Sequence, residues 1–135
     1  MLNVTVSGDV CARGHEDTLN YAAARTLLAD MLPVLESADV RIVNWENPTT
    51  DTEGFPISKS GAMLHSKPQN VEFLKAGGFE SVRVPVAWSN MMSKDGKYTI
   101  SPEYFDRIDE IVGYILDNDM YCIINIHWDG GWWED

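Results

Sequence analysis

The sequence predicts an α/β fold, in which four mostly parallel strands alternate with helices in a partial barrel or an open sheet. Two observations predict it. Four segments rich in β-branched and apolar residues cover residues 2–7, 39–44, 81–87 and 120–127, and helix-like stretches separate them. This alternation is typical of a parallel sheet covered by helices. The length of 135 residues excludes a whole eight-stranded α/β barrel, which needs about 200–250 residues.

The first strand is expected over residues 2–7, where apolar and polar residues alternate. A helix is expected over roughly residues 19–36, and Pro33 lies inside it. Proline lacks the backbone N–H that a helix interior needs, so we expect a kink or a restart of the helix at Pro33. The second strand covers residues 39–44 and leads into an irregular stretch over residues 47–66. A loop of this length is usually functional or mobile.

The second half is expected to contain two helices and two strands. The first helix runs from Pro68 to Gly77-Gly78, because glycine readily adopts the left-handed conformation that ends helices. Ser101 and Pro102 are the expected N-cap and first residue of the second helix. Its apolar residues recur at helical spacing and are expected to face the sheet; they are Phe105, Ile108, Ile111, Val112 and Ile115. The last strand, over residues 120–127, is nearly all apolar, which predicts burial on both faces.

The composition is that of an acidic globular protein. Ten Lys and Arg stand against 21 Asp and Glu, which gives a net charge of −11 and a pI near 4.5. Because such a chain lacks a basic face, nucleic acid and anionic membranes are poor partners. No stretch is long enough to span a bilayer, and residues 2–6 alternate like a strand instead of forming a signal peptide. Cys11 and Cys122 do not make a disulfide scaffold.

Polar and aromatic residues follow each predicted strand. In a parallel sheet the carboxyl ends of all strands meet at one edge, where α/β proteins bind ligands. We therefore expect Asp9, Glu46, Arg83 and His127 to lie in one neighbourhood, with Trp88 at the same edge. Arg83 lies between two valines of an interior strand, so its guanidinium needs a carboxylate or a ligand.

Each of these residues also has a purely structural interpretation. Asp9 is suited to cap a helix or to form a turn, and Asn44 and Glu46, which flank a tryptophan, are suited to bracket a loop. His127 at a strand end is compatible with a half-buried histidine whose hydrogen bonds are satisfied. Trp88 and Trp132 are suited to close the end of the sheet, because aromatic rings bury large areas. The sequence leaves both interpretations open.

Several N-terminal segments are similar to those of a known family; they are Gly8-Asp9-Val10 and residues 38–48, 56–61 and 67–74. On these segments, residues 1–78 resemble the capsule and poly-γ-glutamate synthesis proteins, whose fold is related to the calcineurin-like metallophosphoesterases. The resemblance implies that Asp9 and Glu46 are ligands of a divalent metal, which prefers such oxygen donors. That family continues into an Asn-Asn-His motif, which is missing after Gly78. Two carboxylates alone cannot hold a catalytic two-metal centre.

Segments of the C-terminal half are similar to a second family. Residues 78–88 match a barrel strand, residues 102–116 match the helix after it, and residues 121–133 match the next strand with its loop. On these segments, residues 72–135 resemble glycoside hydrolase family 5, the cellulase-type (β/α)8 barrels. The resemblance implies that Arg83 orients a catalytic carboxylate and that His127 contacts sugar near the cleavage point. It also implies that tryptophans line the cleft; they are Trp88, Trp128 and Trp132.

The catalytic residues of family 5 have no counterpart in this sequence. Retaining glycosidases need two carboxyl groups about 5–5.5 Å apart, and in this family both are glutamates on later strands. Glu134 matches neither glutamate, so we predict no catalytic residue and no hydrolysis by the chain alone. The glycosidase interpretation needs no cofactor and implies a polysaccharide or oligosaccharide ligand. The alternatives are a capsule-type module with a divalent metal and an inert interaction domain.

The two resemblances meet where a helix ends in Gly-Gly-Phe. We therefore predict a capsule-synthesis-like segment over residues 1–78 and a family 5-like segment over residues 79–135, merged in one structural domain. An open sheet leaves strand edges uncovered, so we also predict that copies of the chain associate through such an edge. The sequence does not determine the cellular location, although both families are often extracytoplasmic.

Overall fold

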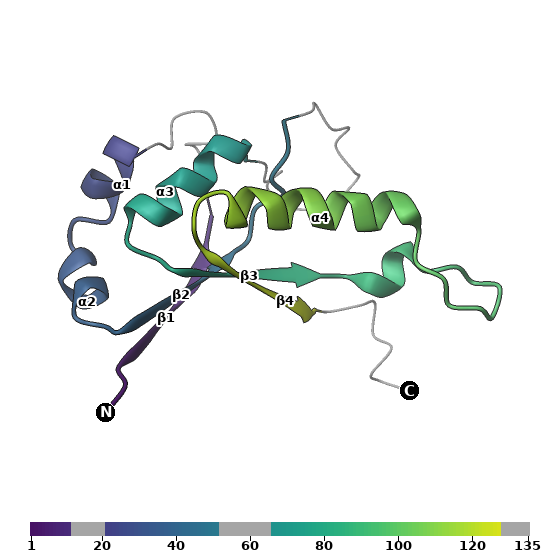
Figure 1. Cartoon of the computed structure of the whole chain (residues 1–135), viewed down its shortest axis with the longest axis horizontal. Coiled ribbons are helices and arrows are strands. Elements are labelled where there is room, and N and C mark those ends of the chain that lie inside the picture. Colours follow the sequence, from purple (N-terminus) through teal and green to yellow (C-terminus); the bar gives the residue numbers. More distant parts are fainter. Residues whose placement is uncertain (12–20, 52–65, 128–135) are drawn as a thin grey trace.

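A computed structural model describes residues 1–11, 21–51 and 66–127. Four strands form one sheet; they are β1 (Val4–Val10), β2 (Val40–Trp45), β3 (Ser81–Val86) and β4 (Tyr121–Ile126). The strands lie in the order β1-β2-β3-β4, and each pairs in parallel with its neighbour. β1 and β4 are therefore the two edges of an open sheet (Figure 1). This arrangement confirms the predicted α/β fold with four parallel strands.

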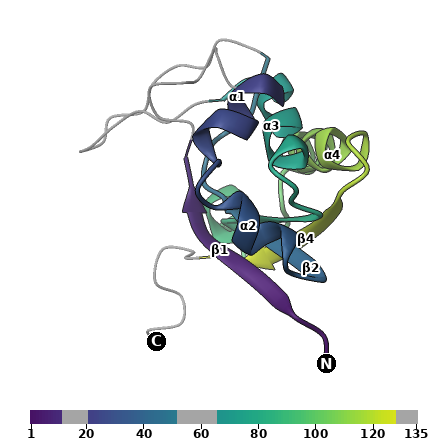
Figure 2. The same cartoon turned by 90° about the vertical axis from the view of Figure 1, so that its left-hand side faces the viewer.

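Helices connect the strands. α1 (Tyr21–Leu27) and α2 (Leu32–Glu36) lie between β1 and β2 in the chain. The short 3-10 helix η1 (Pro68–Asn70) leads directly into α3 (Val71–Ala76), which precedes β3, and η2 (Trp88–Met91) and α4 (Pro102–Leu116) lie between β3 and β4. Figures 1 and 2 show α3 and α4 on the same side of the sheet, with α1 beside α3. The opposite face of the sheet is not covered by any helix that the structure describes.

The first helical region divides at Pro33. α1 ends at Leu27, and α2 begins at Leu32 with Pro33 in its first turn. A proline fits there because the first turn of a helix leaves its backbone N–H groups without helical partners. The restart of the helix that the sequence allowed at Pro33 is therefore confirmed.

The core lies between the sheet and the helices. Val43 of β2 and Val82 and Val86 of β3 are buried in it. The helices contribute apolar side chains to the same cluster; among them are Ala24, Leu28, Leu35, Phe73, Leu74, Ile108 and Ile115. Residues from both predicted segments, before and after Gly78, therefore share one core.

Two glycines shape the end of α3. Gly78 has a φ of 88°, a left-handed conformation that favours glycine. Gly77 has an ordinary helical φ of −71°, but a β-carbon placed on it would lie 2.5 Å from Leu28 Cδ1. Gly77 therefore allows the residue that follows α1 to pack closely on α3. The predicted end of this helix at Gly77-Gly78 is confirmed.

The last helix begins where the sequence predicts. α4 starts at Pro102, and Ser101 is its N-cap with an extended backbone. The Ser101 hydroxyl accepts a hydrogen bond from the backbone N–H of Tyr104 at 3.1 Å. This contact provides a partner for one of the N–H groups that the first turn leaves without one.

The face that α4 turns toward the sheet differs from the prediction at one residue. Ile108 and Ile115 are buried, as predicted. Phe105 is 46% exposed, and its ring contacts Trp88 instead of the sheet. Figure 1 shows the cause, because the first turn of α4 extends beyond the end of β3 and lies over η2. The prediction that Phe105 faces the sheet is therefore wrong.

The burial predicted for the last strand is also wrong. In β4, Tyr121, Ile124 and Ile126 are 75%, 45% and 56% exposed, although the strand is nearly all apolar. β4 is an edge strand, and the described residues include no element beyond it. Val4 and Val6 of the other edge strand, β1, are exposed as well. An apolar sequence predicted the strand correctly, but it carries no information on whether other layers cover it.

Two further predictions concern the cysteines and the membrane. Cys11 and Cys122 are both free thiols, Cys11 exposed and Cys122 half-buried. None of the described helices has the length and apolar character that crossing a bilayer requires.

Candidate functional site

Four polar residues meet at the carboxyl edge of the sheet. Asp9 of β1 is the register partner of Asn44 on β2, and Asn44 is the partner of Arg83 on β3. Register partners in a sheet point to the same face, so these three side chains share the face of the sheet opposite the helices, which we call the open face. His127 follows β4, and its backbone N–H donates to the Val86 carbonyl at 3.2 Å. We call Asp9, Asn44, Arg83 and His127 the strand-end row.

Hydrogen bonds join the strand-end row from one edge of the sheet to the other. Asn44 Nδ2 donates to Asp9 Oδ1 at 2.5 Å and to Glu46 Oε1 at 2.7 Å. Arg83 Nη1 donates to Asn44 Oδ1 at 2.6 Å. Arg83 Nη2 lies 3.2 Å from His127 Nδ1. The predicted neighbourhood of Asp9, Glu46, Arg83 and His127 is confirmed, while the roles of these residues remain predictions.

Charge is distributed unevenly along the strand-end row. The carboxylates of Asp9 and Glu46 lie on one side of the Asn44 amide, and the Arg83 guanidinium lies on the other. Cys11, next to the end of β1, responds to the negative side. Partial desolvation, followed by the charges of Glu46 and Asp9, raises the pKa of its thiol. The edge therefore offers acceptors near β1 and β2 and donors near β3 and β4.

Asn44 is the residue that the sequence interpretation missed. The sequence places it at this edge with only a structural role beside Glu46, yet it contacts three of the other polar side chains there. A signal was present in the spacing, because residues two apart on a strand point to the same face. Asn44 and Glu46 are two residues apart, so if the Glu46 side chain belongs to the site at the strand end, the Asn44 side chain is expected to lie beside it.

Trp88 lies on the other side of the strand end. Its ring makes an edge-on contact with Tyr104, with 6.1 Å between centroids and 85° between planes. A tilted contact with Phe105 has 5.7 Å between centroids and 50° between planes. Both partners belong to α4, so Trp88 packs on the helix side, whereas Arg83 faces the open side. This geometry favours the structural interpretation of Trp88, and its contact with sugar remains a prediction.

The structure does not test the remaining predictions for the site. Trp128, Trp132 and Glu134 lie outside the described residues. Within residues 1–11, 21–51 and 66–127, no three His, Cys, Asp or Glu side chains form a group that could hold a metal ion. Asp9 and Glu46 are bridged by an amide N–H group, which cannot be a metal ligand. Metal binding by these two carboxylates therefore remains a prediction.

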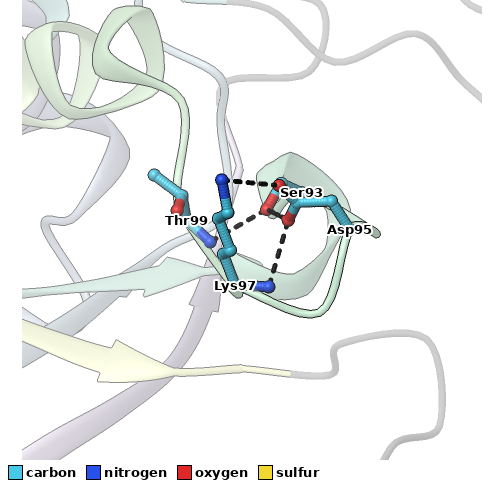
Figure 3. Close-up of polar contacts among 4 residues, drawn as sticks. All are labelled: Ser93, Asp95, Lys97 and Thr99. Atoms are coloured by element: carbon cyan, nitrogen blue, oxygen red, sulfur yellow. Dashed lines mark hydrogen bonds and ion pairs between the residues drawn. The ribbon is translucent and has the colours of Figure 1, made fainter.

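A turn held by its own polar side chains extends from the same edge, between η2 and α4 (Figure 3). Asp95 Oδ1 accepts hydrogen bonds from the Ser93 hydroxyl at 2.5 Å and from the backbone N–H of Lys97 at 3.1 Å. These two bonds lower the pKa of Asp95. Ser93 Oγ also accepts from the backbone N–H of Thr99 at 3.0 Å. The turn extends the protein surface beyond the end of β3.

Comparison with known proteins identifies relatives of the chain. The cellulase family (glycosyl hydrolase family 5) matches residues 38–135. The xyloglucan-specific endo-beta-1,4-glucanase of Bacteroides ovatus is 34% identical over 111 residues, which are 80% of this chain and 22% of the relative. Endoglucanase 1 of Ruminococcus albus is 32% identical over 111 residues, which are 82% of this chain and 26% of the relative. The chain thus spans about a quarter of the length of these curated relatives.

Solved structures of similar proteins share the fold. The trimodular GH5_4 subfamily endoglucanase superposes with a TM-score of 0.53 and 25% identity, over 77% of this chain and 19% of that one. The catalytic domain of CelCCA superposes with a TM-score of 0.50 and 29% identity, over 73% of this chain and 27% of that one. The four-stranded open sheet therefore corresponds to part of a larger family fold.

These relatives decide between the two resemblances. Nothing among them supports the capsule-type interpretation of residues 1–78, and the family match begins at residue 38, inside that segment. The matched range contains β2, β3 and β4. It therefore includes Asn44, Arg83 and His127 of the strand-end row. This chain belongs to the cellulase family, glycosyl hydrolase family 5.

Proposed function

We propose that this chain supplies sugar-facing strand ends of a family 5 glycoside hydrolase and binds a β-linked glucan along the strand-end row. The observation that carries the proposal is the continuous set of hydrogen bonds from Asp9 through Asn44 and Arg83 to His127 on the open face. The names of the relatives point to the same ligand class, because they describe endoglucanases and a xyloglucan-specific glucanase.

The chemistry of the row suits a neutral sugar. Pyranose hydroxyl groups both donate and accept hydrogen bonds, and the row presents carboxylate acceptors at one end and guanidinium and imidazole groups at the other. No cofactor is needed for such binding. The net charge of −11 does not oppose a neutral glycan but repels an anionic one. We therefore expect neutral glucans to bind better than polyuronates of the same length.

We further propose that the chain by itself binds glucan without cleaving it. A retaining glycosidase places its two carboxyl groups about 5–5.5 Å apart, one on each side of the scissile bond. Asp9 and Glu46 both accept hydrogen bonds from Asn44 Nδ2. The amide nitrogen occupies the space between these two oxygens, so a sugar does not fit there. The two carboxylates are therefore unsuited to act as nucleophile and acid/base.

Glucan binding is tested by titrating the chain with a soluble β-1,4-linked glucan oligosaccharide. Arg83→Met removes the donors that face Asn44 and His127, and hydrogen bonds of charged groups contribute about 1.5–3 kcal/mol. We expect Arg83→Met to weaken binding by about tenfold or more. The matched control is Arg41→Met, because Arg41 pairs with Glu80 near the amino end of the sheet and its loss should leave the affinity unchanged. Equal affinities of the wild type and Arg83→Met would contradict the proposal.

The absence of cleavage is tested separately by the release of reducing ends from a soluble β-glucan. We expect no release above the rate of a heat-denatured sample. Hydrolysis that Glu134→Gln abolishes would contradict this part of the proposal and would assign a catalytic role to Glu134.

We also propose that residues 1–78 and 79–135 act as one structural domain. Two contacts across residue 78 support it. β2 pairs in register with β3, and Lys75 Nζ of α3 donates a hydrogen bond to the Asp119 carbonyl, which precedes β4, at 2.8 Å. A domain boundary at residue 78 would have to break this sheet and core.

A further inference from the structure

The side-chain amide of Asn44 has only one orientation that satisfies its neighbours. Its two N–H donors face two acceptors, Asp9 Oδ1 at 2.5 Å and Glu46 Oε1 at 2.7 Å. Its oxygen accepts from Arg83 Nη1 at 2.6 Å. Turning the amide over would place its oxygen against two carboxylates and its N–H groups against a guanidinium, which only donates. The two carboxylates therefore determine where the acceptor for Arg83 lies.

The position of Arg83 in turn determines the state of His127. A guanidinium has five donors and no acceptor, and it stays protonated in proteins. Its Nη2 lies 3.2 Å from His127 Nδ1, so this contact requires a lone pair on Nδ1. A neutral His127 ring with its lone pair on Nδ1 carries its hydrogen on Nε2. The exposed ring then offers Nε2–H as a donor to a ligand.

We infer that Asp9 and Glu46 are positioning residues, which act through the Asn44 amide on Arg83 and thereby fix the Nε2–H tautomer of His127. The inference rests on the proposed function only for the identity of the ligand, a glucan hydroxyl oxygen that accepts from Nε2–H. It assigns the two carboxylates a role that needs no metal. It also explains why Arg83 is held from both sides, by Asn44 and by His127.

The effect of the carboxylates on Arg83 is indirect. Among the ion pairs of the described residues, none joins Arg83 to Asp9 or Glu46. The amide of Asn44 is the element that they share. Cutting the connection at Asn44 should therefore have the same effect on His127 as removing both carboxylate charges. The two changes together should have no more effect than either one, as expected for groups that act in series.

The test measures the His127 tautomer directly, by long-range proton–nitrogen NMR correlation of the imidazole ring. In the wild type we expect one tautomer, with the hydrogen on Nε2. In the double variant Asp9→Asn/Glu46→Gln, each new amide presents either an oxygen or an N–H group, so Asn44 loses its single orientation. We expect a mixture of tautomers there and in Asn44→Leu, which keeps both carboxylates but removes the connection.

The matched control is Asp39→Asn. Asp39 accepts a hydrogen bond from the Asn3 backbone N–H at 2.8 Å near the amino end of the same sheet. Its substitution removes one carboxylate of the same kind at the end of the sheet opposite the strand-end row. We expect the His127 tautomer to be unchanged in this variant. A change in Asp39→Asn as large as in the double variant would overturn the inference, because it would reflect general loosening of the sheet.

Glucan affinity is the second readout. We expect Asp9→Asn/Glu46→Gln to weaken binding about two- to tenfold, the effect of about one neutral hydrogen bond. If the double variant shifts the tautomer but the wild type binds no glucan, the proposed function fails and the positioning role stands. If the wild type binds glucan but the double variant leaves the tautomer unchanged, the positioning role fails and the proposed function stands.

The competing metal role of Asp9 and Glu46 has its own outcome. Titration of the wild type with Mn²⁺ alone should not affect the two carboxylates at submillimolar concentration. Submillimolar binding that disappears in Asp9→Ala would overturn the positioning role, because a cation would then take the place of the Asn44 amide. The same Mn²⁺ titration of Asn44→Leu is a check, because this variant removes the bridging amide and leaves both carboxylates available to a metal.

Discussion

Gly77→Ala tests how the segment before β2 packs on the part of the chain that matches the cellulase family. Leu28 lies outside the matched residues 38–135, and Gly77 lies inside them. A β-carbon on Gly77 would lie 2.5 Å from Leu28 Cδ1 and 3.3 Å from the Phe73 carbonyl oxygen. Carbon atoms in contact are normally about 3.5–4.0 Å apart. Leu28 is buried, so its methyl group has little room to move away.

The expected cost follows from this overlap. Forcing an extra carbon into a packed core costs about 1–3 kcal/mol. Part of this cost is offset, because alanine is favoured over glycine at a helical φ by about 0.5–1 kcal/mol. We expect Gly77→Ala to lower the free energy of unfolding by about 0–2.5 kcal/mol, the difference between these two ranges. Urea unfolding followed by tryptophan fluorescence measures it as a lower midpoint at an unchanged slope.

Two comparisons make this test specific. A β-carbon on Gly113 of α4 would have no atom within 4 Å, so Gly113→Ala should stabilise the protein by about 0.5–1 kcal/mol. Leu28→Ala removes the clashing methyl group, so adding Gly77→Ala to it should cost nothing further. If Gly77→Ala alone is as stable as Gly113→Ala, Leu28 does not pack on α3, and the reasoning is refuted.

Three further predictions address α4, the negative side of the strand-end row and the sheet edges. Hydrogen bonds from Tyr114 and Arg107 lower the pKa of Glu110. A carboxyl whose pKa is lower in the folded state stabilises the fold above its unfolded pKa and loses this effect as the pH falls through the folded pKa. Glu110→Gln should therefore lower the melting temperature near neutral pH, with a difference that disappears on acidification; a difference independent of pH would contradict this. Glu46→Gln removes a charge that raises the pKa of Cys11, so alkylation of Cys11, followed by peptide mass spectrometry, should become faster. Glu72→Gln on α3 is the control, and equal Cys11 rates in both variants would argue against the described geometry. Because β1 and β4 are the edge strands of the sheet formed by the described residues, size-exclusion chromatography should show association that increases with concentration, whereas a monomer at every concentration would oppose it.

The arrangement of the strand ends was predictable because it depends on topology more than on side-chain detail. Alternation of strands and helices implies a parallel sheet, and a parallel sheet brings every strand end to one edge. Asp9, Arg83 and His127 were therefore placed together from the sequence alone, and hydrogen bonds join them through Asn44. The connecting role of Asn44 was not predicted, because an asparagine in a strand carries no charge that requires a partner.

The failed predictions concern layers that no local pattern encodes. The apolar run of β4 predicted burial on both faces, yet Ile126 is 56% exposed because β4 is an edge. Periodicity placed Phe105 on the face of α4 that looks toward the sheet. α4 begins beyond the end of β3, so Phe105 meets Trp88 there instead. The spacing of apolar residues identifies which face of a helix or strand is apolar, but it does not determine which element lies opposite each residue.

The central claim, that glucan binds at the strand-end row, is tested most directly by mapping amide shifts during titration with a β-1,4-linked glucan oligosaccharide. We predict that the largest changes occur at Asn44, Arg83 and His127, with none at Asp39 and Glu80 near the amino end of the sheet. Changes concentrated at Asp39 and Glu80, or confined to the helices, would contradict the claim.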